Sequence, residues 1–90
     1  MKRLYIIFTG KVQGVGFRTF VQLQAIKYHC SGFVKNMENG NVEMEIQGED
    51  SDINHVLSVL KEGNMFIQVH DYAIKEISCI KEDKRFVIHY

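Results

Sequence analysis

The sequence predicts an α+β domain in which two helices cover one face of an antiparallel β-sheet, with the elements in the order βαββαβ. Strand-like segments with alternating apolar residues are interrupted twice by segments whose apolar residues recur at helical spacing. An Asn-Gly pair separates two strand-like segments and favours a hairpin. The chain has 90 residues, 46% of them hydrophobic, which is enough for one compact core. We therefore expect a single domain over residues 1–90.

The first half of the chain should supply a strand, a helix and a hairpin. The strand is predicted over residues 2–9, where apolar residues occupy both sides as in a central strand. The helix is predicted over residues 18 to about 28 from its apolar spacing. The hairpin joins strands at 33–38 and 41–47 through a type I′ turn at Asn39-Gly40.

The second half should supply a helix and two strands. The acidic cluster Asp50-Ser51-Asp52 offers an N-cap, and Gly63 offers a C-terminal stop. Between them four apolar residues lie at i, i+3, i+4 and i+7: Ile53, Val56, Leu57 and Leu60. A fourth strand is predicted from residue 69 or 71 to 78, and a short terminal strand over 85–90 after a charged turn. This order predicts a split βαβ, ferredoxin-like sandwich.

The segment from Gly10 to Arg18 links the first strand to the first helix and is typical of an anion site. Glycine tolerates positive φ, so consecutive backbone N–H groups can face one concavity, and the start of a helix adds more unpaired N–H groups. Taken alone, Gly14 and Gly16 fit a plain connection equally well. Arg18 favours the anion site, because the helix dipole disfavours a cation at that end unless an anion lies between them. The sequence contains no Gly-x-x-x-x-Gly-Lys-Ser/Thr motif, and the Gly-x-Gly-x-x-Gly motif fails because Thr19 stands where its third glycine belongs.

Two motifs resemble those of the acylphosphatase family. The segment Gly-Lys-Val-Gln-Gly-Val-Gly-Phe-Arg at 10–18 is similar to the family's Gly-x-Val-Gln-Gly-Val-x-Phe-Arg loop. Residues 32–36 and 39–43 resemble its Gly-Trp-Val-x-Asn and Asp-Gly-x-Val-Glu segments. The resemblance covers essentially the whole chain, in length and in the order of elements.

The resemblance implies an enzyme that hydrolyses the carboxyl-phosphate bond of small acyl phosphates. It assigns phosphoryl binding to Arg18 and water orientation to Asn36, which on sequence alone reads as a strand-end residue. The backbone groups of five residues complete the phosphate site: Gln13, Gly14, Val15, Gly16 and Phe17. Because a carboxylate leaves readily, such a site needs no general acid, and neither motif contains a histidine or carboxylate placed to act as one.

The chain departs from the family's pattern at a few positions. Phe33 stands where tryptophan is common, and Asn39 where aspartate is common. His29 occupies the helix end where relatives often have glycine, so a left-handed conformation there would carry a steric cost. These differences bear on stability and loop shape more than on Arg18 or Asn36.

The composition limits the kinds of partner and ligand that we expect for this protein. Eleven basic and eleven acidic residues give zero net charge, so we expect no binding to nucleic acid or anionic membranes. We expect a cytoplasmic protein, since the short apolar run after Met1-Lys2-Arg3 lacks the features of a signal peptide. We also expect a monomer. Cys30 and Cys79 are predicted to be free thiols, and the four histidines show no zinc-like pairing. We expect no metal and no cofactor, with phosphate or sulfate as product-like ligands.

Two rival functions stay open at this stage. One is an acylphosphatase-like domain that handles carbamoyl phosphate, which the lack of zinc-finger-like cysteine pairs disfavours. The other is a non-catalytic ferredoxin-like module that binds RNA or a small effector. The RNA-binding alternative is disfavoured because the sequence shows neither a basic face nor the Gly-aromatic pattern of RNA-binding strands.

Overall fold

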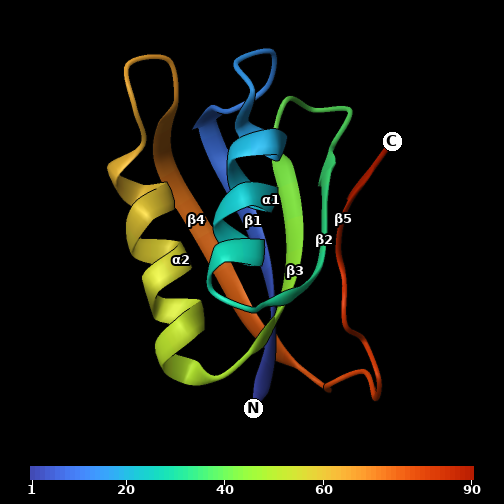
Figure 1. Ribbon diagram of the computed structural model, residues 1–90. Helices are drawn as coiled ribbons and strands as arrows, with labels where there is room; N and C mark the ends of the chain where they lie inside the picture. Colours follow the sequence, from blue (N-terminus) through green and yellow to red (C-terminus); the bar gives the residue numbers. More distant parts are fainter.

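In the computed structural model, which describes residues 1–90, two helices cover one face of a five-stranded sheet (Figure 1). The spatial order of the strands is β4-β1-β3-β2-β5, and β1 to β4 pair antiparallel. The predicted fold class is therefore confirmed. The bounds of the elements are β1 (Lys2–Lys11), α1 (Phe17–Lys27), β2 (Ser31–Asn36), β3 (Val42–Gly48), α2 (Asp50–Glu62), β4 (Gln68–Ile77) and β5 (Phe86–His89).

The last strand makes the sheet mixed, because β5 pairs parallel with β2. The chain leaves β4 at one edge of the sheet and crosses to the other edge before β5 begins (Figure 1). Side chains of the central strands hold this crossing segment. The guanidinium of Arg3 donates to Asp83 at 2.8 Å, and the Gln47 amide both donates to the Ile80 carbonyl (2.9 Å) and accepts from its N–H (2.7 Å).

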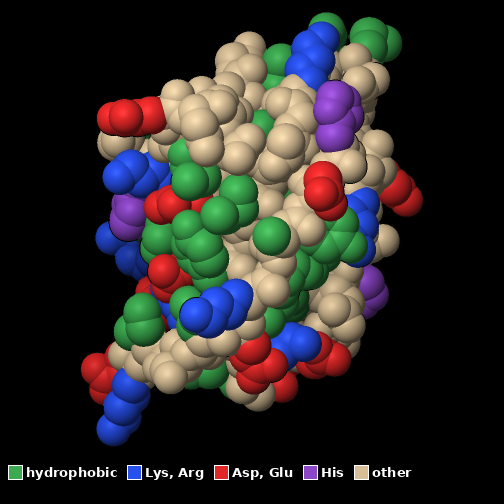
Figure 2. Space-filling model, turned by 180° about the vertical axis from the view of Figure 1, so that it is seen from behind, with side chains coloured by type: hydrophobic (Ala, Val, Ile, Leu, Met, Phe, Trp, Pro, Cys, Tyr) green, Lys and Arg blue, Asp and Glu red, His purple; other side chains and the backbone are tan.

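The core lies between the sheet and the helices. The four apolar residues that predicted α2 are all buried there, which confirms the spacing argument. The opposite face of the sheet has no helix over it. Figure 2 shows that face, where hydrophobic side chains in the middle are interspersed with acidic and basic ones. Neither helix is long and apolar enough to cross a lipid bilayer.

The β2–β3 hairpin differs from the predicted two-residue turn. A type I′ turn needs positive φ at both central residues, but only Gly40 (φ 93°) has it, and Asn39 does not. The loop instead has three residues. Met37 donates to the Asn41 carbonyl at 2.8 Å, and Gly40 donates to the Met37 carbonyl at 3.3 Å. The Asn39 side chain accepts from the N–H of Asn41, so its predicted place in the turn is confirmed although the turn type was wrong.

The helix ends bring one correction and one confirmation. Glu49 is the N-cap of α2 and makes no side-chain cap, so the predicted capping by the Asp50 cluster is wrong. The Asp50 carboxylate pairs with Lys2 instead, while it still lies in the first turn, where negative charge suits the dipole. His29 is left-handed (φ 60°) after α1, and Cys30 donates to the Ala25 carbonyl at 2.8 Å as in a Schellman motif. The expected strained histidine is therefore present.

Candidate active site

The β1–α1 loop, residues 12–16, is held at both ends by buried side chains. Val12 precedes its turn and Phe17 follows it, and each is only 1% exposed. The Phe17 ring packs edge-on against Phe8 of β1, with the ring centroids 5.3 Å apart. Both ends of the loop are therefore anchored in the core, and a binding site needs such anchoring if its donors are to be placed before the ligand arrives.

Within this loop two glycines take the left-handed conformation, Gly14 at φ 73° and Gly16 at φ 79°. A Cβ at either position would meet nothing within 4 Å, so the positive φ, and not crowding, is what requires glycine. Gly16 is also the N-cap of α1. The backbone N–H groups from Gly14 to Thr19 donate no hydrogen bond within the protein. They form a set of unused donors at the positive end of a helix.

Arg18 lies in the first turn of α1 and is half-buried. None of the protein's ion pairs includes it. Its nearest partners belong to the end of the chain: Nη1 lies 3.4 Å from the His89 carbonyl, and Cζ lies 4.9 Å from the centre of the Tyr90 ring. The guanidinium is thus oriented by contacts that do not neutralise its charge.

Asn36 is the last residue of β2 and faces the same region from the neighbouring part of the sheet. Its side-chain oxygen Oδ1 is buried and has no hydrogen-bond partner. Buried polar atoms are nearly always paired, so an unpaired one beside a cavity indicates a place for a ligand or water.

A cavity of about 120 Å³ brings these parts together. Arg18 and Asn36, which lie on different elements of the fold, both line it. The predicted residues Gly14, Gly16 and Phe17 also line it. Two further lining residues escaped the sequence analysis, Val12 and Thr19. Thr19 adjoins Arg18 in the first turn of α1, and that position was the only signal for it.

Two of the predicted phosphate-site residues do not line the cavity. The side chain of Val15 packs against the hydrophobic core. The side chain of Gln13 turns to the β2–β3 hairpin, where its amide donates to two backbone carbonyls. His89 and Tyr90 contact Arg18 but were not expected near it, because only the parallel pairing of β5 brings them there.

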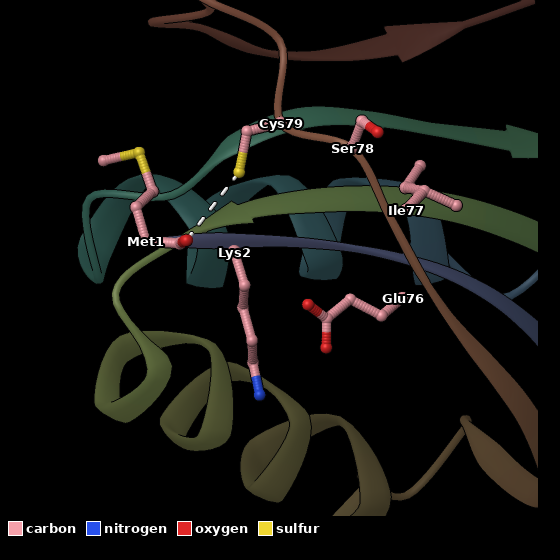
Figure 3. A pocket seen from close by; sticks show the side chains of 6 residues that line it. All are labelled: Met1, Lys2, Glu76, Ile77, Ser78 and Cys79. Carbon is pink, nitrogen blue, oxygen red and sulfur yellow. Dashed lines mark hydrogen bonds between the residues drawn. The ribbon is translucent and has the colours of Figure 1, made fainter.

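Other parts of the structure fit an anion site less well. A larger hollow of about 520 Å³ lies at the opposite end of β1. Figure 3 shows the side chains that line it, where the Cys79 thiol approaches the Met1 carbonyl. The one cationic side chain of this hollow, Lys2, is already paired with Asp50. No three His, Cys, Asp or Glu side chains group as metal ligands, and both cysteines are free thiols.

The small cavity therefore brings together a guanidinium, unused backbone N–H groups and an amide oxygen. A sequence model of the acylphosphatase family matches residues 4–88. The chain belongs to the acylphosphatase family. It is 43% identical over 90 residues to the acylphosphatase of Geobacillus thermodenitrificans, covering 100% of this chain and 96% of that protein. It is an enzyme of that family, and the reaction that the family name describes is the hydrolysis of acyl phosphates.

Solved structures of relatives agree. The crystal structure of the Bacillus subtilis acylphosphatase superposes with a TM-score of 0.93 at 38% identity, and 100% of each chain is covered. The acylphosphatase from Coxiella burnetii gives a TM-score of 0.88 at 31% identity, with 98% of this chain and 92% of that chain covered. HypF from T. kodakarensis, at 30% identity and a TM-score of 0.87, is matched over 12% of its length by 100% of this chain. The likeness to HypF is therefore to one part of a larger protein.

Proposed function

We propose that this acylphosphatase acts on small acyl phosphates in the 120 Å³ cavity, with Arg18 and the β1–α1 loop holding the phosphoryl group and Asn36 orienting the attacking water. One observation carries the proposal. A guanidinium without an ion-pair partner, a row of unused N–H groups and an unpartnered amide oxygen all meet at one small cavity. The first two match the charge of a phosphoryl group, and the third matches a water O–H.

The reaction needs little more than this. A water oxygen forms a bond to phosphorus, the bond from phosphorus to the carboxylate oxygen breaks, and the carboxylate leaves with the bonding electron pair. No histidine or carboxylate side chain lines the cavity, so we infer that a phosphoryl oxygen accepts the proton of the water. Holding the phosphoryl group and placing the water then supply the rate enhancement.

The position of Asn36 also orients the acyl group. Attacking and leaving oxygens lie roughly in line across phosphorus, so water held at Asn36 implies that the acyl group departs on the opposite side. A hollow of about 400 Å³ adjoins the cavity through Asn36 and has Lys35, Glu43 and Tyr90 among its lining residues. It therefore lies on the side from which water arrives.

We propose further that residues 1–90 act as a single domain, as a cytoplasmic monomer, without metal or cofactor, and without binding nucleic acid. The open face of the sheet supports the last point. The central strand β3 presents Glu43 and Glu45 there, opposite Ile7 and Tyr5 of β1. The Glu43 carboxylate at the middle of that face would repel the phosphates of RNA, whereas the charge of Glu45 is already paired with Arg3 at 2.7 Å. A catalytic role is therefore favoured over an RNA-binding one.

Hydrolysis of benzoyl phosphate, followed by its ultraviolet absorbance, tests the proposal. The wild-type protein should accelerate hydrolysis, and Arg18→Ala should lower turnover by a factor on the order of 10²–10³, as expected for losing a preorganised donor to developing charge. Lys27→Ala, at the exposed far end of the same helix, is the matched control and should behave as wild type.

The outcomes separate the alternatives. Near-native turnover by Arg18→Ala would refute the role of Arg18. No acceleration by the wild-type protein would favour a binding module. Acceleration with carbamoyl phosphate but not with benzoyl phosphate would favour the domain that handles carbamoyl phosphate.

A further inference from the structure

The side chain of Gln13 points from the β1–α1 loop to the β2–β3 hairpin, where the hairpin loop begins. Its Nε2 donates to the carbonyl oxygens of Met37 and Asn41, at 2.7 Å each. One amide group thereby joins the loop that carries the N–H donors to the hairpin that carries Asn36. No other side-chain hydrogen bond links these two segments.

The two carbonyls belong to residues next to the cross-strand pair Asn36–Val42, one on each strand. Met37 directly follows Asn36, and Asn41 directly precedes Val42, which is the cross-strand partner of Asn36. The hairpin closes at this same place, since Met37 donates to the Asn41 carbonyl at 2.8 Å. The Gln13 amide therefore holds the end of the hairpin at the residue pair next to the pair Asn36–Val42.

We propose that Gln13 is a positioning residue, whose side-chain amide sets the distance of Asn36 from the β1–α1 loop and hence the placement of the attacking water. This role rests on the proposed part of Asn36 in the reaction. Oδ1 of Asn36 accepts no hydrogen bond within the protein, so the backbone at the end of β2 decides where that oxygen lies. Gln13 is the group that ties this backbone to the phosphoryl site.

The hydrogen-bond pattern separates this role from plain structural support. Without the Gln13 amide, the Met37 carbonyl still accepts from Gly40 at 3.3 Å, and the Asn41 carbonyl still accepts from Met37 at 2.8 Å. Neither acceptor is left unpaired, so the hairpin keeps its own closure. Loss of the amide should therefore appear in the chemical step more than in folding.

Gln13→Met removes both donors while keeping the length of the side chain. We expect kcat for benzoyl phosphate to fall by a factor on the order of 10–100, because an ångström of misplacement costs about that much, while the inhibition constant of inorganic phosphate stays unchanged. Gln22→Met is the matched control, since the Gln22 amide also donates to a backbone carbonyl, that of Phe86 at 3.1 Å, but does not line the cavity. The control should leave kcat unchanged.

A double-mutant cycle with Asn36→Ala decides the mechanism. If Gln13 acts through Asn36, Gln13→Met should lower kcat much less when Asn36 is already replaced by alanine. An equal loss in both backgrounds, or an unchanged kcat in Gln13→Met alone, would overturn the proposal. A wild-type protein without hydrolysis would instead refute the proposed function, so the two failures are distinct.

Gln13→Glu gives a second test that does not depend on the folding of Gln13→Met. The ionised form of the introduced carboxyl group donates nothing to the two carbonyls, whereas its protonated form donates one hydrogen bond. The ratio of the variant's kcat to that of wild type should therefore rise as the pH falls through the titration of this carboxyl group. A ratio independent of pH would contradict the positioning role.

Discussion

At the residue scale, Asn36 and Asn39 differ in whether their side-chain oxygens are hydrogen-bonded. The place of Asn36 before a hairpin favours a turn or strand-end role, and the turn role goes instead to Asn39. The buried, unpartnered Oδ1 of Asn36 costs about 1–3 kcal/mol if nothing hydrogen-bonds to it. A protein can retain such an atom where a water molecule or a ligand completes the site.

Cys30 gives a prediction on pH. Burial, and secondarily the charge of Asp52, raise the pKa of its thiol to about 11. The folded state thus holds this proton more tightly than the unfolded state, so the thiol's contribution to stability is complete below its ordinary pKa and is lost as the pH rises toward 11. The free energy of unfolding, measured in urea, should fall from about pH 9 upward.

The variant Cys30→Ala tests whether this thiol causes the pH dependence. Cys30→Ala should show a shallower fall of the free energy of unfolding between pH 9 and about 11. Parallel pH dependences for wild type and Cys30→Ala would show that another group is responsible.

A site residue could be identified from the sequence where its role depends on neighbouring residues in the chain. Arg18 could be found from the sequence because a cation at a helix start conflicts with the dipole. The side-chain role of Gln13 could not, since its two acceptors lie 24 and 28 positions away. The contact of Tyr90 with Arg18 likewise depends on pairing across the whole chain.

At the scale of elements, the β1–α1 loop depends on its left-handed glycines. Gly16→Ala should cost about 1–2 kcal/mol in the free energy of unfolding, because alanine is strained at φ 79° although its Cβ meets no neighbour. It should also lower kcat/KM, since relaxing the strain moves the N–H donors. Urea unfolding and the benzoyl phosphate assay measure the two effects.

Gly40→Ala is the matched control for this substitution. Gly40 also has positive φ, and a Cβ added there would likewise meet no atom within 4 Å, but it lies at the hairpin tip outside the cavity. It should lose similar stability and keep more of kcat/KM. Equal losses of activity in the two variants would show that the conformation of the β1–α1 loop has no special part in catalysis.

Periodicity predicted the elements well because it reports which face of each segment is buried. The four apolar residues of α2 and the alternation in β1 are both realised in the core. Periodicity could not predict which of several possible partners a side chain or a strand would choose. Asp50 pairs with Lys2 instead of capping α2, the hairpin loop takes three residues, and β5 joins the far edge of the sheet in parallel.

At the scale of the whole molecule, the fold concentrates the chemistry at one end of the sheet. The β1–α1 loop and the β2–β3 hairpin lie at the same end, and the chain's C-terminus approaches it along the edge (Figure 1). With zero net charge, the protein offers no broad field to an anion. Recognition must therefore come from groups placed by the fold within the small cavity.

The central claim is that this cavity binds a phosphoryl group between the loop N–H groups and Arg18. Titration of the ¹⁵N-labelled protein with inorganic phosphate tests it most directly. We predict saturable shifts of the backbone amide resonances from Gly14 to Thr19, with smaller ones at Asn36, and their loss in Arg18→Ala. Absence of saturable shifts in this loop, or stronger ones at the hollow beside Met1 and Cys79, would contradict the account.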